Sequence, residues 1–108
     1  MPVAGYVPDA GDIVWLDFSP QTGHEQARRR PALVLTPASY NRFGLMLCCP
    51  MTTRRKGYPF EVILEEGSVA LADQIKSLDW KGRNAQPNGR ASDVALKQVR
   101  AMATKLIG

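Results

Sequence analysis

The hydrophobic pattern of the chain changes period once, near Ser92, and this change separates a strand-like part from a helical part. Before it, short runs rich in β-branched and aromatic residues alternate with stretches of proline, glycine and polar residues, a pattern typical of strands and turns. After it, Leu96, Val99, Ala103 and Leu106 follow one another at helical spacing. Ser92 is a suitable N-cap, so the sequence predicts several short strands followed by one C-terminal helix.

Five runs precede this change, and we expect strands over most of Asp12–Phe18, Pro31–Pro37, Leu45–Pro50, Tyr58–Leu64 and Ser68–Trp80. Proline at both ends of the second run predicts that it does not extend as a central strand. Residues 38–44 and 81–90 are predicted as turn and loop, because they contain glycine and asparagine. The fold class predicted is therefore mostly β, a small antiparallel barrel or curled sheet with the helix packed on it.

The length of 108 residues suits one compact domain, so residues 1–108 are predicted to form a single domain. Cys48 and Cys49 are adjacent, and neighbouring side chains of a strand point to opposite faces, so no bridge between them is expected. With one histidine and no CxxC pair, neither a metal site nor a cofactor is expected. No signal peptide is seen, and no apolar run reaches the roughly 18 residues of a membrane helix, so we expect a cytoplasmic protein without a membrane anchor.

Positive charge is concentrated rather than spread. Of the 14 lysines and arginines, six lie in Arg28–Arg30 and Arg54–Lys56, and the formal net charge is +4. Both stretches are predicted to connect strands, so a curled sheet can bring them to one rim as a groove for an anionic backbone. Two separate solvated loops remain the alternative, and the sequence alone does not decide between them.

Arginine fills five of these six places, and its planar guanidinium binds phosphate through two hydrogen bonds at once. Glu25 lies in the same predicted loop as Arg30, either as an ion-pair partner or as a base beside a phosphate site. Thr52 follows the third predicted strand, where a hydroxyl can cap a turn or bind a phosphate oxygen. His24 is the one histidine, a residue type whose unperturbed pKa lies near neutrality, but a lone loop histidine is more often a bystander than a catalyst.

Four short motifs occur in a distinctive order: Gly11-Asp12 before the first predicted strand, Arg30-Pro31 at the second, Pro50–Thr53 after the third, and Ala72–Gln74 late in the chain. Together they resemble the MazF/PemK toxin family, ribonucleases of bacterial toxin–antitoxin pairs. The sequences KGYPFEV and VALADQ are most similar to the MazF branch of the family. The resemblance covers nearly the whole chain, including its final Leu-Ile-Gly.

The resemblance implies an SH3-like β-barrel with added helices, related to the fold of CcdB, and a homodimer. It implies cleavage of single-stranded RNA at short specific sequences without a metal, leaving 2′,3′-cyclic phosphate and 5′-hydroxyl ends. It also implies a cognate small acidic antitoxin, whose extended C-terminal segment lies across the RNA site.

The motifs also imply roles for individual residues. Arg30, before the proline, and Thr52 match the key arginine and threonine of the family, and Glu25 matches its acidic loop residue. One departure is Arg29, which stands where some relatives carry a histidine. With RNA as substrate, the predicted RNA-binding residues are Arg28, Arg29, Arg54, Arg55, Lys56, Tyr58 and Gln74, the last two through stacking and hydrogen bonding.

Metal-free cleavage needs a deprotonated 2′-hydroxyl in line with the leaving oxygen, and stabilisation of the phosphorane charge. Arg30 suits charge stabilisation, Thr52 can donate to a non-bridging oxygen, and Glu25 can orient Arg30 or accept the 2′-hydroxyl proton. The residues do not decide which group is base and which is acid. Two other functions remain open: a CcdB-type protein that binds DNA gyrase, and an RNA-binding barrel without catalysis.

Overall fold

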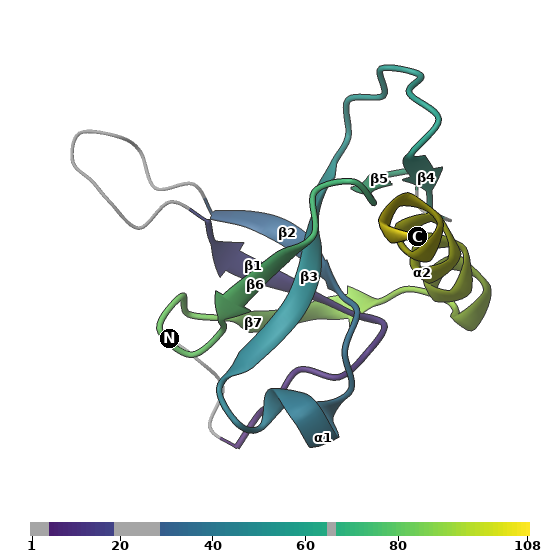
Figure 1. Ribbon diagram of the computed structural model, residues 1–108. Helices are drawn as coiled ribbons and strands as arrows, with labels where there is room; N and C mark the ends of the chain where they lie inside the picture. The colour runs from purple at the N-terminus through teal and green to yellow at the C-terminus, as the bar shows by residue number, and fades with distance from the viewer. Residues whose placement is uncertain (1–4, 19–28, 65–66) are drawn as a thin grey trace.

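A computed structural model describes residues 5–18, 29–64 and 67–108 (Figure 1). These residues form seven strands and two helices: β1 (Asp12–Asp17), β2 (Arg29–Val34), α1 (Ala38–Asn41), β3 (Leu45–Thr52), β4 (Glu61–Ile63), β5 (Val69–Leu71), β6 (Lys76–Asp79), β7 (Gln86–Arg90) and α2 (Asp93–Ile107). Among them, no helix has the length and apolar character that a bilayer span requires.

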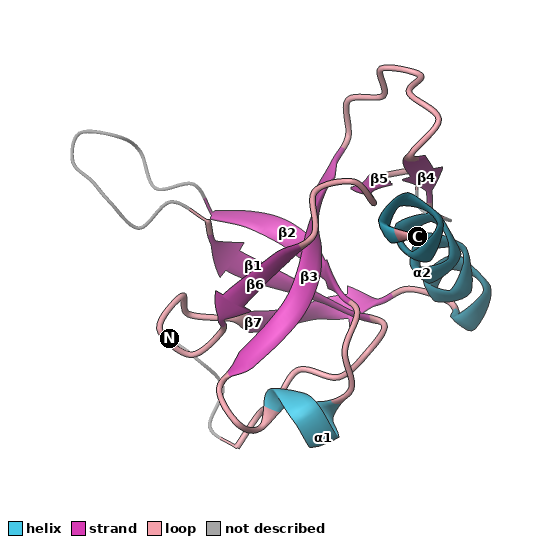
Figure 2. Ribbon diagram, in the orientation of Figure 1, coloured by secondary structure: helices cyan, strands magenta, loops and turns pink. Residues whose placement is uncertain are grey.

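The strands form one antiparallel sheet in the order β4-β5-β3-β2-β1-β7, with β6 also paired to β3. The long strand β3 changes partner along one edge, because residues 45–48 pair with β6 whereas Met51 and Thr52 pair with β5. The sheet curls at this change, and α2 lies beside β4 (Figure 2). The predicted mostly β fold, with a curled antiparallel sheet and a C-terminal helix, is confirmed.

Consecutive strand residues feed two separate hydrophobic cores, because their side chains leave opposite faces of the sheet. The helix-side core includes Ile13, Leu33, Cys49, Met51 and Val99. The inner core includes Val14, Leu16, Ala32, Val34 and Cys48. Cys48 and Cys49 therefore point into different cores and are both unbridged, as the sequence predicts.

The predicted helix and its cap are confirmed. The Ser92 hydroxyl accepts a hydrogen bond from the backbone N–H of Ala95 at 3.0 Å. Ala95, Val99 and Ala103 are the buried residues of α2, whereas Leu106 is half exposed. The buried stripe is thus rotated slightly from the predicted one, toward the small side chains that let the helix approach the sheet closely.

The number of strands was predicted wrongly. The run Ser68–Trp80 is divided into β5 and β6, and the chain turns between them, where the N–H of Gln74 donates to the Leu71 carbonyl. Residues 81–90, predicted as a loop, contain β7, which pairs with β1 despite Pro87 and Gly89. Its other edge has no partner in the sheet order of the described strands, and proline is tolerated at such an edge.

The second strand was also predicted wrongly in position. β2 begins before Pro31 and ends at Val34, and it is a central strand between β1 and β3. Pairing of β2 with β3 begins only at Ala32, so Pro31 lies at the end of that ladder and its missing N–H interrupts nothing there. The predicted turn at 38–44 begins with the short helix α1.

Candidate functional site

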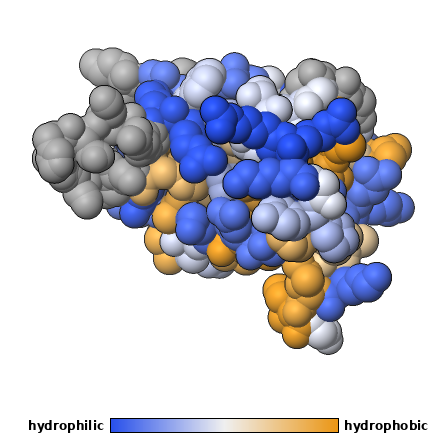
Figure 3. Space-filling model, turned by 90° about the horizontal axis from the view of Figure 1, so that it is seen from above, coloured by the Kyte–Doolittle hydropathy of each residue, from blue (hydrophilic) through white to orange (hydrophobic). Residues whose placement is uncertain are grey.

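A hollow of about 370 Å³ lies where β2 begins and β3 ends, at the base of the β3–β4 loop. Its lining residues are Arg30, Thr52, Arg54, Lys56, Tyr58, Phe60, Glu61, Leu71, Asp73 and Gln74. The hollow therefore unites residues from both basic stretches of the sequence. The face that carries the β3–β4 loop shows many hydrophilic side chains gathered together (Figure 3).

The strand register explains why Arg30 and Thr52 lie at the same end of the β2–β3 ladder. β2 and β3 pair antiparallel with Ala32 opposite Pro50. The pairing ends there, and Arg30 and Thr52 each stand two residues beyond this last pair, at the same end of the ladder. Both line the hollow, so these two predicted catalytic residues face one space.

An aromatic ring anchors the guanidinium of Arg30. The Cζ atom of Arg30 lies 5.6 Å from the centroid of the Phe18 ring, within cation–π range. Phe18 itself packs against the inner core. On the β1 side, Arg30 stands opposite the fully buried Leu16. The guanidinium of Arg30 thus packs against a residue of the core rather than extending from a solvated loop.

Thr52 caps a turn and still faces the hollow. Its Oγ1 accepts a hydrogen bond from the backbone N–H of Arg54 at 3.1 Å. An acceptor role leaves the hydroxyl proton able to donate to an anionic ligand. This hydroxyl can therefore cap the turn and bind a phosphate oxygen at the same time.

The β3–β4 loop is organised by one carboxylate. Glu61 accepts hydrogen bonds from the backbone N–H groups of Lys56 at 3.2 Å and Gly57 at 3.0 Å. Gly57 has a φ of 82°, in the left-handed region that glycine enters without strain. Tyr58 and Phe60 are stacked, with ring centroids 5.2 Å apart. Glu61 therefore holds the backbone of the loop that presents these rings and cations.

Two acidic residues of the hollow, Glu61 and Asp73, were missed by the sequence analysis. Asp73 stands in the Ala72–Gln74 motif, which carries part of the family resemblance but had no predicted chemical role. Glu61 is the one charged residue of the run Tyr58–Leu64, which is a usable signal in an otherwise apolar strand. Gln74, predicted to bind RNA, lines the hollow beside Asp73.

The remaining predicted residues lie elsewhere. Arg55 is exposed on the β3–β4 loop but does not line the hollow. Arg29, next to Arg30, pairs with Asp17 at 2.9 Å. Glu25 and Arg28 lie outside the described residues.

The described residues contain no group of three or more histidine, cysteine or acidic side chains that could hold a metal ion. Burial raises the pKa of the Cys48 and Cys49 thiols to about 12, which excludes them as thiolate nucleophiles near neutral pH.

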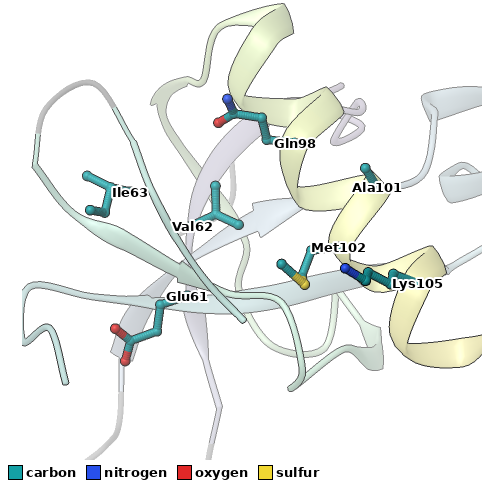
Figure 4. Close-up of a pocket in the computed structure, with 7 residues that line it drawn as sticks. All are labelled: Glu61, Val62, Ile63, Gln98, Ala101, Met102 and Lys105. Carbon is teal, nitrogen blue, oxygen red and sulfur yellow. The ribbon is translucent and has the colours of Figure 1, made fainter. Parts of the chain in front are cut away.

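A second hollow, of about 510 Å³, lies between β4 and α2. Figure 4 shows Val62 and Met102 facing this space from the strand and the helix. Glu61 also lines this hollow, so this residue stands on the boundary between the two hollows.

Comparison with known proteins gives consistent results. A family model described as "PemK-like, MazF-like toxin of type II toxin-antitoxin system" matches residues 9–107. The "Endoribonuclease toxin MazF" of Escherichia coli (strain K12) is 50% identical over 98% of this chain and 99% of that protein. The "Endoribonuclease toxin ChpB" of the same organism is 35% identical over 84% of this chain and 86% of its own length.

Among solved structures, a MazE-MazF complex from Deinococcus radiodurans contains a similar chain. The two chains are 54% identical with a TM-score of 0.90, and the match covers 95% of this chain and 97% of the other. An endoribonuclease in complex with its cognate antitoxin from a mycobacterial species is 18% identical with a TM-score of 0.73, covering 94% of this chain and 95% of the other, which shows a shared fold.

Proposed function

Because the chain belongs to the PemK-like, MazF-like toxin family of type II toxin–antitoxin systems, we propose that it is an endoribonuclease that cleaves single-stranded RNA at specific sequences without a metal ion. The observation that carries this proposal is that Arg30 and Thr52 line the same hollow. A protein that only binds gyrase has no need of this pair, which supports the nuclease over the CcdB-type alternative.

In the proposed reaction, the RNA 2′-hydroxyl loses its proton and its oxygen attacks the adjacent phosphorus. The bond from phosphorus to the 5′-oxygen breaks, and that oxygen takes up a proton to become a 5′-hydroxyl. The other product is a 2′,3′-cyclic phosphate, so no water is consumed in this step. The protein has to align the two oxygens and stabilise the charge that develops on the phosphoryl group.

Arg30 supplies the main stabilisation of this charge, because its guanidinium is always protonated and is anchored beside Phe18. Thr52 donates its hydroxyl proton to a non-bridging phosphate oxygen. Glu25, outside the described residues, is the proposed carboxylate that orients Arg30 or accepts the 2′-hydroxyl proton. Preorganised donors of this kind need no reorientation as the reaction proceeds.

The other predicted site residues bind the substrate. Arg28, Arg54, Arg55 and Lys56 contact backbone phosphates and set affinity, because phosphate contacts dominate affinity for nucleic acids. Tyr58 stacks on a base, which every nucleobase permits. Gln74 hydrogen-bonds a base edge, and such edges are accessible in single strands.

The proposed partners follow the family. Its solved relatives include toxin chains in complexes titled MazE-MazF. By analogy, a small acidic antitoxin places its carboxylates against the basic residues of the hollow and so blocks RNA. The proposed assembly is a homodimer, and the proposed location is the cytoplasm, where the RNA substrate and the antitoxin are found.

Incubation of the purified protein with a long RNA of defined sequence, in the presence of EDTA, tests this proposal. Discrete fragments with 2′,3′-cyclic phosphate ends are expected, and sequencing of those ends gives the recognition sequence. A copy with deoxyribose 5′ of the cut should bind and stay intact, because it lacks the attacking hydroxyl. Retention of RNA without cutting would contradict the enzyme, and neither binding nor cutting would favour a gyrase-binding protein.

A further inference from the structure

Arg29, the residue that departs from some relatives, is hydrogen-bonded to two other parts of the chain. Its Nη1 donates to Asp17 Oδ1 at 2.9 Å, and its Nη2 donates to the backbone carbonyl of Asn84 at 2.7 Å. The Nδ2 of Asn84 donates in turn to Asp17 Oδ2 at 2.9 Å. Three residues from β1, β2 and the turn between β6 and β7 therefore form a closed set of hydrogen bonds, called here the stem clamp.

The same β6–β7 turn is bonded to the backbone of β1. Arg83 Nη1 donates to the carbonyls of Asp17 at 3.1 Å and Phe18 at 2.9 Å. The backbone N–H of Asp17 donates to the Arg83 carbonyl at 3.0 Å. Asn84 adopts a φ of 56°, in the left-handed region that asparagine enters more readily than most residues. The turn is thus shaped to present a carbonyl to Arg29 and an amide to Asp17.

The position of the stem clamp links it to the candidate site. Asp17 and Arg29 are opposite one another in the β1–β2 register. Their chain neighbours, Phe18 and Arg30, form the cation–π contact that anchors the predicted catalytic guanidinium. The clamp therefore fixes the β1 backbone next to Phe18 and the β2 backbone next to Arg30.

Burial and charge agree with a structural use of Arg29. Its side chain is 32% exposed and that of Asp17 is 25% exposed, so the ion pair is only partly solvated. The Asn84 hydrogen bond and then Arg29 hold the pKa of Asp17 below its ordinary value, although burial opposes them. These two bonds use two of the five N–H donors and turn the guanidinium toward Asp17 and Asn84, and Arg29 does not line the hollow that holds Arg30.

We infer that Arg29 is a positioning residue that acts through Asp17 and Asn84 to hold Arg30 in its reactive place, rather than a residue that grips RNA phosphate. This inference rests on the proposed function. A lysine cannot replace Arg29, because one ammonium group does not reproduce the fork that reaches both acceptors. The clamp thus makes the spacing of β1, β2 and the β6–β7 turn a determinant of cleavage rate.

The decisive variant is Asp17→Asn, because the two roles for Arg29 predict different effects. If Arg29 bound phosphate, removal of a nearby negative charge would leave RNA binding equal or stronger, with the cleavage rate unchanged. If Arg29 positions Arg30, Asp17→Asn should reproduce the defect of Arg29→Ala. Both should lower the single-turnover rate at saturating protein on the order of 10- to 100-fold, as expected for a small displacement of a catalytic group.

The full test compares wild type, Arg29→Ala, Arg29→Lys, Asp17→Asn and the double variant Asp17→Asn/Arg29→Ala on one RNA with a single mapped cleavage site. The double variant should be no slower than the slower single variant, and Arg29→Lys should not recover the rate. Arg42→Ala is the matched control for loss of one cation, because Arg42 is exposed beside Phe43 at the end of α1. The rate of this control should equal that of the wild type.

Circular dichroism and thermal melting establish that each variant is folded. If Arg29→Ala does not fold, Asn84→Gly replaces it in the comparison. Glycine keeps the backbone conformation and the carbonyl that accepts from Arg29, but it removes the hydrogen bond to Asp17. Cleavage by Asn84→Gly should then be several-fold slower than cleavage by the wild type. A wild-type rate for Asp17→Asn would overturn the inference. The inference would also be overturned if Arg29→Ala cut at the wild-type rate at saturation and lowered the slope of log affinity against log salt by about 0.7. A wild-type protein that does not cut would instead contradict the proposed function.

Discussion

The two basic stretches of the sequence are alike in composition but are held in opposite ways. On β2, the guanidinium of Arg30 stacks on Phe18, and that of Arg29 is bound by Asp17 and Asn84. On the β3–β4 loop, Arg54–Lys56 are exposed, and Arg54 and Lys56 donate hydrogen bonds through their backbone N–H groups, to Thr52 and Glu61. The first stretch fixes its side chains, whereas the second fixes its backbone and leaves its side chains in solvent.

This difference assigns different functions to equal charges. A cation held by a packed core can stabilise a transition state without reorganising, which is the usual source of electrostatic catalysis. Solvated cations on a loop attract a polyanion and adapt to its path, which raises affinity in a salt-dependent way. The comparison therefore predicts chemistry at β2 and binding at the β3–β4 loop.

The largest effect is expected from Arg30→Ala. Removal of the fixed cation should lower cleavage on the order of 1000-fold or more while the fold survives, because Arg30 is only partly buried at a strand end. Single-turnover rates on an RNA with one cleavage site measure the loss of cleavage, and circular dichroism shows whether the variant is folded. A folded variant that cuts at the wild-type rate would remove Arg30 from the mechanism.

Thr52→Ala should lower the rate by about 10- to 1000-fold, as for loss of one donor to an oxyanion. Thr52→Ser keeps the hydroxyl and should recover most of the activity. The neighbouring Thr53 is exposed and does not line the hollow, so Thr53→Ala is the matched control with wild-type activity. Equal losses for Thr52→Ala and Thr53→Ala would show that only the shape of the turn matters.

Neutralisation of the loop should change affinity rather than chemistry. Each of Arg54→Gln and Arg55→Gln should weaken RNA binding and lower the slope of log affinity against log salt by about 0.7, the value for one phosphate contact with a single strand. Fluorescence anisotropy at several salt concentrations measures this slope. An unchanged slope would show that these cations do not touch phosphate.

Glu61→Gln tests how the loop backbone is held. An amide accepts through one oxygen only, so the hydrogen bonds from Lys56 and Gly57 should weaken, and RNA affinity should fall by less than about tenfold. The rate at saturating protein should change less than the affinity does. If the rate fell and affinity did not, Glu61 would belong with the fixed region rather than with the loop.

The smallest effect concerns pH and the stem clamp. The pKa of Asp17 is held below its ordinary value of 3.8, so the stability it contributes is present above that value and is lost as pH falls through the lowered pKa. The difference in melting temperature between wild type and Asp17→Asn should therefore be constant near neutral pH and shrink in strong acid. A difference independent of pH would contradict this ionised form of the clamp.

Local patterns identified the fold class but not every strand. The change of period at Ser92 predicted the one long helix, because capping and helical spacing are local properties. The division of Ser68–Trp80 into two strands depends on β3 changing partner, which is a long-range property. For the same reason β7 was missed, since its pairing with β1 outweighs the turn preference of Asn88 and Gly89.

The candidate site was predictable where a motif marked it. Arg30 and Thr52 were identified from motifs, and the structure brings both into one hollow. Glu61 was missed because its acceptor role requires the folded loop. Arg29 could not be assigned a partner, because Asn84 lies far away in the sequence and the side-chain charge alone suggested phosphate binding.

The central claim is that the cation fixed on β2 performs chemistry and that the loop cations supply affinity. The most direct test is the single-turnover cleavage rate at saturating protein and low salt, for Arg30→Ala and for the double variant Arg54→Gln/Arg55→Gln. The loop variant should come within about threefold of the wild-type rate once saturated, because lost uniform binding does not slow the bound complex. Arg30→Ala should stay slow at every protein concentration. Recovery of Arg30→Ala at saturation, or a loop variant that stays equally slow, would contradict the account.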